Sequence, residues 1–271
     1  MSTLSKSLSS AAVTAIQPLP SLRTLPYFLL PGLALHLTVY RGIPLMERAG
    51  LAPFEAFIIA FTVPFAILFA LAFGLTQAEG IPMTHGALVE RWRMHRPTWR
   101  QLVWTLGGLV VIMLLSGALS PTRILLLRAF PALQPPSIFP PILDPTLQNS
   151  TLPQTVMDWM GPEVGGRWTW AILALVLFFF NNVGEELYFR GYLLPRQELA
   201  VGKWAWLVQA LLWNAYHLFF YPWYLVFGLS LTLVIPFIAQ QTRNTWTAIL
   251  MHGLLNLPLT LLMVSVALGG N

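Results

Sequence analysis

Seven long runs of apolar residues dominate this sequence. We expect helices at about 25–40, 52–75, 102–119, 168–190, 203–220, 222–240 and 246–268. Each run approaches the roughly 20 residues that a helix needs to cross the hydrocarbon of a bilayer. The runs are continuously apolar and lack the alternation that is typical of membrane β-barrel strands. The sequence therefore predicts an all-α fold, a polytopic membrane helix bundle with about seven transmembrane helices, within a range of six to eight.

The composition agrees with a membrane protein and excludes several kinds of site. Charged residues make up 9% of the chain, whereas a soluble globular domain has about 25%. Cysteine is absent, which excludes disulfides and thiolate metal sites. The net charge is +5, and in a membrane protein basic residues mostly determine topology and contact anionic lipid. We therefore expect membrane lipids as partners and no nucleic acid.

The chain divides into an N-terminal tail and one membrane domain. Residues 1–22 are Ser-rich, and we expect them to form an N-terminal tail. Residues 23–271 contain the apolar runs and are expected to form the polytopic domain. The segment 121–166 is long and Pro-rich, with no full span. Within it, Ile124–Ala132 could lie in the membrane interface as an amphipathic helix. The whole segment could cap a cavity from the non-cytoplasmic side.

Loop charges indicate the orientation of the bundle. With seven spans, one side collects ten basic residues: Lys6, Arg23, Arg91, Arg93, Arg96, Arg100, Arg190, Arg196, Lys203 and Arg243. The other side has five: Arg41, Arg48, Arg123, Arg128 and Arg167. Cytoplasmic loops carry the excess of Lys and Arg. The N-terminus and the Arg190–Lys203 turn are therefore expected on the cytoplasmic side. The membrane itself is expected to be the plasma (inner) membrane.

Two adjacent carboxylates, Glu185 and Glu186, follow shortly after the fully apolar run 170–180. Ionisable groups within membrane segments are costly and by default mark a functional site. Arg190 lies one helical turn after Glu186, so these two can pair on one face. Glu185 is rotated by roughly 100° from Glu186 and faces a different neighbour. One carboxylate can thus be held by Arg190 while the other stays free for chemistry.

Two further apolar runs carry polar groups at a similar depth. Trp213 and His217 lie in the run 203–220, and His252 and Asn256 lie four residues apart in the run 246–268. At about 1.5 Å per residue, Glu185 and Asn256 are about 15 Å from the expected cytoplasmic ends, His217 about 21 Å and His252 about 9 Å. The side chains could therefore converge in one polar cavity near the middle of the bilayer. Trp213 is expected only to pack around it.

These groups suit the hydrolysis of an amide, which needs an activated water, an oxyanion donor and an acid for the leaving amine. Glu185 and His217 could hold the water between them. His252 and Asn256 could donate to the oxyanion, and Glu186 with Arg190 could lock the end of the helix. These residues make no cofactor certain, and zinc is the one that they could bind.

Other readings of the same residues stay open. Zinc could be bound by Glu185, His217 and His252, although the His-Glu-x-x-His helix of common zinc proteases is absent. A non-catalytic immunity or binding scaffold, or a small transporter, could use the same polar cavity. The polar set could also serve only as hydrogen-bonding contact between helices.

The three motifs together resemble those of the CPBP intramembrane proteases. They are Glu185-Glu186-x-x-x-Arg190, an aromatic-x-x-x-His motif that ends at His217, and His252-x-x-x-Asn256. The family includes type II CAAX prenyl endopeptidases and bacteriocin-processing proteins, and the resemblance covers about residues 167–265.

The resemblance implies a helical membrane bundle whose active site opens to the cytoplasm. It implies hydrolysis of a peptide bond by a glutamate-type or metalloprotease mechanism, with Glu185 and His217 activating water and with His252 and Asn256 at the oxyanion. The substrate would be a membrane-associated peptide or lipidated protein, such as a prenylated CAAX protein.

Overall fold

The chain folds into helices throughout its described part. The computed structural model describes residues 16–136, 139–147 and 151–270, and no strand occurs in these ranges. The principal helices are α1 (Ser21–Leu37), α3 (Pro53–Ala78), α5 (Trp99–Leu119), α8 (Trp168–Phe179), α10 (Ala205–Leu218), α12 (Leu229–Thr242) and α13 (Thr245–Ala267). The shorter ones are α2 (Ile43–Arg48), α4 (His85–Arg91), α6 (Pro121–Ala129), α7 (Leu152–Met160), α9 (Leu194–Val201) and α11 (Tyr224–Phe227). The predicted all-α class is confirmed.

Six helical stretches of the described residues are long and apolar enough to cross a membrane. The fourth, Trp168–Leu218, has 51 residues. A straight helix of that length would measure about 77 Å, more than twice the thickness of the hydrocarbon. The stretch instead turns back at Gly202, whose φ of 58° lies in the left-handed region. It therefore contains two of the predicted runs, and the structure agrees with a bundle of six to eight passes.

The helices differ from the predicted runs at some boundaries. The predicted run 222–240 begins late: a turn follows α10, and the chain becomes helical again at Tyr224. Pro222 explains this break, since it has no backbone N–H and disfavours a helical conformation at the residue before it. In the predicted tail 1–22, residues 1–15 lie outside the described residues. Leu19 is buried and its N–H donates to the carbonyl of Arg196 at 3.0 Å, so this part of the predicted tail packs on α9.

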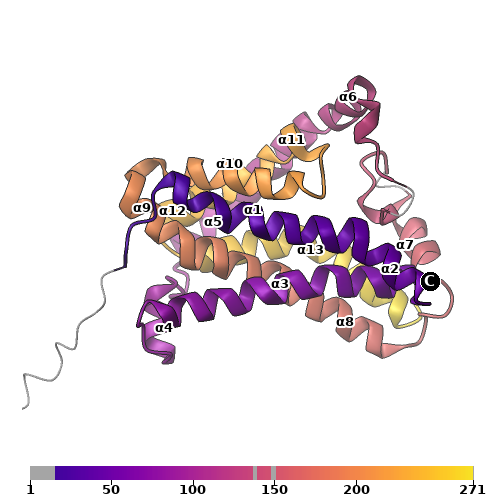
Figure 1. The fold of residues 1–271 in the computed structure, drawn as a ribbon, viewed down its shortest axis with the longest axis horizontal. Helices are drawn as coiled ribbons and strands as arrows, with labels where there is room; N and C mark the ends of the chain where they lie inside the picture. The colour runs from indigo at the N-terminus through magenta and orange to yellow at the C-terminus, as the bar shows by residue number, and fades with distance from the viewer. Residues whose placement is uncertain (1–15, 137–138, 148–150, 271) are drawn as a thin grey trace, which may run out of the picture.

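The principal helices form a closed ring around the middle of the bundle. In Figure 1, α1 and α3 run side by side, with α4 and α9 at one end of the bundle and α6 and α7 at the other. Along the ring, α3 packs on the segment that follows α8, α8 packs on α13, and α13 packs on α5 and α12. The helix α12 packs on α10, which packs on α1. Side chains from α8, α10 and α13 can therefore meet inside the ring.

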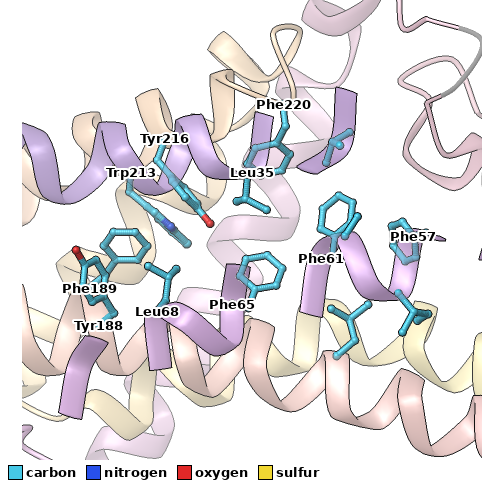
Figure 2. Packing of buried hydrophobic residues seen from close by; sticks show 14 of the residues in the cluster. Leu35, Phe57, Phe61, Phe65, Leu68, Tyr188, Phe189, Trp213, Tyr216 and Phe220 are labelled. Carbon is cyan, nitrogen blue, oxygen red and sulfur yellow. The ribbon is translucent and has the colours of Figure 1, made fainter. Parts of the chain in front are cut away.

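Aromatic side chains fill the space between α1, α3 and α10. Phe57, Phe61 and Phe65 are four residues apart on α3 and thus share one face. Figure 2 shows this row opposite Leu35 of α1 and Phe220, which follows α10. Other side chains of α3 point outward, such as Ile67 with 52% exposure. A helix that is apolar on both its buried and its exposed face fits a lipid environment.

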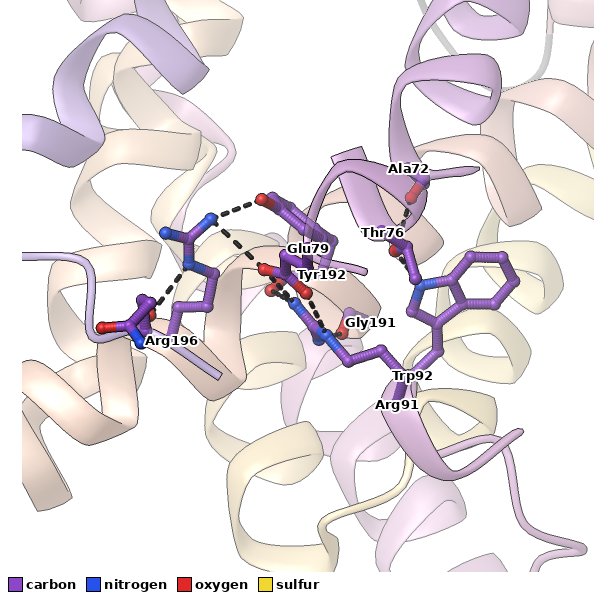
Figure 3. A network of polar contacts seen from close by, with 9 residues as sticks. Ala72, Thr76, Glu79, Arg91, Trp92, Gly191, Tyr192 and Arg196 are labelled. Carbon is purple, nitrogen blue, oxygen red and sulfur yellow. Dashed lines mark hydrogen bonds and ion pairs between the residues drawn. The ribbon is translucent and has the colours of Figure 1, made fainter. Parts of the chain in front are cut away.

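A polar network joins the elements at the end of the bundle that carries α4 and α9 (Figure 3). The guanidinium of Arg91 forms an ion pair with Glu79 at 2.7 Å and also donates to the carbonyls of Gly191 and Tyr192 at 3.1 and 3.2 Å. Arg196 donates to the hydroxyl of Tyr192 and lies 3.4 Å from Glu79. The network ties the C-terminal end of α3 to the chain just after the predicted catalytic motif.

Candidate active site

The segment that carries the two glutamates is a wider helix than the sequence predicts. The π-helical turns η4 (Phe180–Gly184) and η5 (Leu187–Leu193) lie on either side of Glu185 and Glu186. Such π-turns are rare and occur frequently at functional sites. Gly184 allows α3 to come close, because a Cβ at this position would lie 2.8 Å from the carbonyl oxygen of Phe65. The backbone just before the two glutamates therefore packs closely against α3.

Glu186 is the carboxylate that is held by charged partners. Its Oε1 lies 3.2 Å from Nη1 of Arg190 and 2.9 Å from Nδ1 of His252. The Glu186 and Arg190 side chains have no exposed surface, and a buried charge is tolerated when it is paired and hydrogen-bonded. The predicted Glu186–Arg190 pair is thus confirmed. The structure adds that Glu186 also orients His252, which the sequence does not reveal.

Glu185 faces the other way and meets Trp213. The indole Nε1–H donates to Oε1 of Glu185 at 2.8 Å, and Glu185 is 1% exposed. The guanidinium carbon of Arg190 lies 3.6 Å from the centre of the Trp213 ring. Trp213, which was expected only to pack around the cavity, is therefore a hydrogen-bond donor to Glu185. A signal was available, since Trp213 lies one helical turn before His217 and tryptophan carries an N–H.

His217 presents one ring nitrogen to the interior of the bundle. Its Nδ1 lies 2.8 Å from the carbonyl oxygen of Trp213, which can only accept, so Nδ1 carries the proton. In the neutral ring Nε2 is then an acceptor. The ring stacks on Tyr224, with 5.5 Å between the ring centres. Backbone and aromatic contacts thus fix both the orientation and the tautomer of this imidazole.

Asn256 is held by a residue that sequence reasoning missed. Its Nδ2 donates to Oδ1 of Asn182 at 3.0 Å, and Asn182 in turn donates to the carbonyl of Phe178 at 2.6 Å. Asn182 is 2% exposed and lies four residues before Glu186. That spacing is the signal that could have identified it, because residues four apart share one helix face.

A single cavity of about 310 Å³ joins four of the six predicted site residues, namely Glu185, His217, His252 and Asn256. Glu186 and Arg190 do not line it and lie behind its wall. The long segment between α5 and α8 contributes Arg123, Ile142, Leu143 and Asp144 to the lining. Side chains from distant parts of the sequence therefore share one chamber that is lined by aromatic, aliphatic and polar groups. An arginine and an aspartate from outside the three motifs lie in its wall.

The zinc alternative is not supported by this arrangement. Within the described ranges, no three His, Asp or Glu side chains are grouped so that they could hold a metal ion. Nδ1 of His217 bonds to the carbonyl of Trp213, Nδ1 of His252 bonds to Glu186, and Glu185 accepts from the indole of Trp213. We therefore derive no metal-dependent step.

Comparison with known proteins gives one match. Residues 167–258, about a third of the chain, match the family model described as type II CAAX prenyl endopeptidase Rce1-like. Neither the search of the curated proteins nor that of the solved structures found a match. The matched range contains all six predicted site residues and begins one residue before α8. The resemblance that the three motifs indicate is thus confirmed over residues 167–258, which are similar to the Rce1-like type II CAAX prenyl endopeptidases.

Proposed function

We propose that this protein is an intramembrane endopeptidase that hydrolyses a peptide bond with a water molecule activated by Glu185 and His217. The observation that carries the proposal is the shared cavity, which both side chains line together with His252 and Asn256. At the level of the family, the match to the Rce1-like proteins supports an endopeptidase of the CAAX type.

In the proposed reaction, Glu185 accepts a proton from water while the water oxygen attacks the carbonyl carbon of the peptide bond. The second oxygen of Glu185 is available for this step, because Trp213 bonds to Oε1. Nε2 of His217 accepts a hydrogen bond from the other hydrogen of the water and takes up that proton when the product carboxyl group ionises. Glu185 then delivers its proton to the amide nitrogen, the C–N bond breaks, and a carboxylate and an amine are released.

The oxyanion that forms during the attack needs donors on the far side of the cavity. One N–H of the Asn256 side-chain amide donates to Asn182, and the second N–H can donate to the oxyanion. His252 points Nδ1 at Glu186, so its Nε2 can donate only when the ring carries both protons. We therefore assign Asn256 as an oxyanion donor, with His252 joining it in the imidazolium form.

We propose that the substrate is a membrane-associated peptide or lipidated protein, with prenylated CAAX proteins as the class that the family description names. We place the protein in the plasma (inner) membrane. The basic end, with α4 and α9, lies toward the cytoplasm, as the loop charges predict. The sequence resemblance favours a cavity that opens on this side. The alternative is an opening on the other side, because Ile142, Leu143 and Asp144 line the cavity from the opposite end.

The replacement Glu185→Gln tests the catalytic proposal. Gln keeps the size and can still accept from Trp213, but it cannot take a proton, so we expect cleavage to slow by about 10²- to 10⁴-fold. The measurement is mass spectrometry of a membrane-peptide library after incubation with purified protein in nanodiscs. Glu163→Gln is the matched control, because Glu163 is exposed and does not line the cavity.

The outcome separates the alternatives. Unchanged cleavage by the Glu185→Gln protein would exclude Glu185 as the base. If the wild type produces no peptide fragments while the variant alters only ligand binding or stability, the cavity belongs to a scaffold or transporter.

A further inference from the structure

Arg123, the third residue of α6, lines the same cavity as Glu185 and His217. It lies outside residues 167–258 and outside the three motifs. Its position is fixed: Nη2 donates to the hydroxyl of Ser120 at 3.0 Å and Nε donates to the Ser120 carbonyl at 3.5 Å. The guanidinium carbon lies 4.6 Å from the centre of the Phe227 ring. The chamber therefore has a charged group with a set orientation in its wall.

This guanidinium has no carboxylate partner among the residues that the structure describes. Asp144 lines the same cavity, but its Oδ1 accepts from the backbone N–H and the hydroxyl of Thr146 at 2.7 and 2.6 Å. By contrast, Arg91 and Arg93 at the other end of the bundle form ion pairs of 2.7 Å. A guanidinium carries five donors, and the two bonds to Ser120 leave Nη1 unused. The wall of the cavity thus offers an unpaired cation.

The distance between Arg123 and the reacting groups is bridged by two aromatic rings. The ring centres of His217 and Tyr224 lie 5.5 Å apart, and those of Tyr224 and Phe227 lie 5.3 Å apart. The Arg123 guanidinium follows at 4.6 Å from Phe227. An extended residue covers about 3.3–3.6 Å, so Arg123 lies within about five extended residues of His217.

We propose that Arg123 is a specificity-determining residue that binds a carboxylate of the peptide substrate within about five residues of the bond that is cut. The inference rests on the proposed function and adds the charge of the substrate to it. The planar guanidinium matches a carboxylate in a bidentate geometry, and such charge-assisted pairs are stronger in a partly buried wall than at an open surface. The carboxylate is either the C-terminus of the peptide or an Asp or Glu side chain close to the scissile bond.

A binding experiment tests the proposal without relying on turnover. The Glu185→Gln protein, in nanodiscs of phosphatidylcholine, is incubated with apolar hexapeptides in three forms. These forms are a free C-terminal acid, a C-terminal amide, and an amide that contains one Glu. Mass spectrometry of the retained peptides gives the enrichment of each form. We expect at least one carboxylate form to be enriched about ten-fold or more over the plain amide, as one hydrogen-bonded charge pair provides. The form that is enriched identifies the source of the carboxylate.

Variants of Arg123 in the same background give the decisive comparison. Arg123→Gln should abolish the preference for carboxylates, and Arg123→Lys, which keeps the charge without the planar fork, should retain part of it. Arg128→Gln is the matched control from the same helix, because Arg128 is exposed and lies outside the cavity lining. Its preference should be unchanged. Elution as a monodisperse peak in size-exclusion chromatography establishes that each variant is folded.

Equal enrichment of acid and amide peptides, or a preference that survives Arg123→Gln, would overturn the inference. Cleavage by the wild-type protein is measured separately on the enriched peptides. If they bind through Arg123 and are not cut, the proposed function fails and the inference stands. If amide and acid peptides are cut equally well, the inference fails and the proposed function stands.

Discussion

At the scale of single residues, one oxygen atom has a central place in the site. Oε1 of Glu186 accepts hydrogen bonds from the guanidinium of Arg190 and from the imidazole of His252, at 3.2 and 2.9 Å. Glu186, which does not line the cavity, therefore positions Arg190 on its own helix and His252 on α13. Glu185, one residue earlier, is left with the single bond from Trp213. The two adjacent carboxylates thus take different parts.

Replacing Glu186 by Gln should destabilise the protein strongly. Removal of one member of a buried ion pair leaves the other charge uncompensated and typically costs about 3–5 kcal/mol. We expect a clear fall in the midpoint temperature of thermal unfolding. The measurement is tryptophan fluorescence of the protein in detergent during heating. Glu90→Gln is the control, since Glu90 is 76% exposed in a 3.6 Å pair with His95 and should unfold as the wild type does. A Glu186→Gln protein as stable as the control would contradict a structural part for the pair.

Replacing Trp213 by Phe should slow cleavage and leave the fold in place. The change removes the N–H that donates to Glu185 and keeps an aromatic ring below Arg190. A hydrogen bond to a charged group contributes about 1.5–3 kcal/mol, so the rate should fall by about 10- to 100-fold. The measurement is the rate of peptide cleavage in nanodiscs. Trp206→Phe provides the control, because Trp206 packs against Phe237 and does not line the cavity. A wild-type rate for the Trp213 variant would show that Glu185 does not depend on this donor.

At the scale of elements, the short helix α4 supports the segment that carries the motif. Its Arg91 pairs with Glu79 at the end of α3 and donates to the carbonyls of Gly191 and Tyr192 in η5. A π-turn departs from the regular hydrogen-bonding pattern of an α-helix, and partners from outside can stabilise its carbonyls. The basic stretch 85–100, which the sequence suggests only as an indicator of topology, therefore also stabilises the helical segment that follows Glu185 and Glu186.

The variant Arg91→Gln should loosen η5. It removes the ion pair and the bonds to the two carbonyls, so we expect faster amide hydrogen exchange in Leu187–Leu193 and a lower unfolding midpoint. Hydrogen–deuterium exchange with mass spectrometry measures the first effect directly. Arg96→Gln, at an exposed position of the same loop, should leave exchange in η5 unchanged. Identical exchange in the two variants would show that α4 is not a brace.

At the scale of the whole molecule, the ring of helices has chemically different ends. The end with α4 and α9 carries most of the basic residues, while the other end contributes Arg123 and Ile142–Asp144 to the cavity. By the positive-inside rule, the excess of basic residues at the end with α4 and α9 places that end toward the cytoplasm in the proposed orientation. Under the proposed function, a substrate entering from the other end would meet Arg123 and Ile142–Asp144 before Glu185.

Cysteine labelling can determine the orientation, because the natural chain has no cysteine. Met83→Cys lies at the basic end, where Met83 is 42% exposed, and Ala132→Cys lies at the opposite end and is also exposed. A membrane-impermeant maleimide added to intact cells should label Ala132→Cys and spare Met83→Cys until the membrane is opened. The reverse pattern would invert the proposed orientation. Single cysteines next to the cavity, such as Thr146→Cys, would then show the compartment from which it is reached.

Much of the fold follows from the sequence by itself. Apolar runs of about 20 residues leave the backbone few choices in lipid, where each polar backbone group must be satisfied within its own segment. The helical class, the number of passes and the ion pair between Glu186 and Arg190 are all local in this sense. The polar groups could be identified for the same reason, because glutamate, histidine and asparagine in an apolar run are costly unless they have partners.

Only the tertiary structure decides which partners these groups have. The contacts of Glu186 with His252, of Glu185 with Trp213 and of Asn256 with Asn182 each join residues that are 28 to 74 positions apart. The π-turns around the glutamates and the place of Arg123 in the cavity wall depend on how α3, α6 and α11 pack. Helical spacing determines which side chains share a face, whereas packing between helices determines what that face meets.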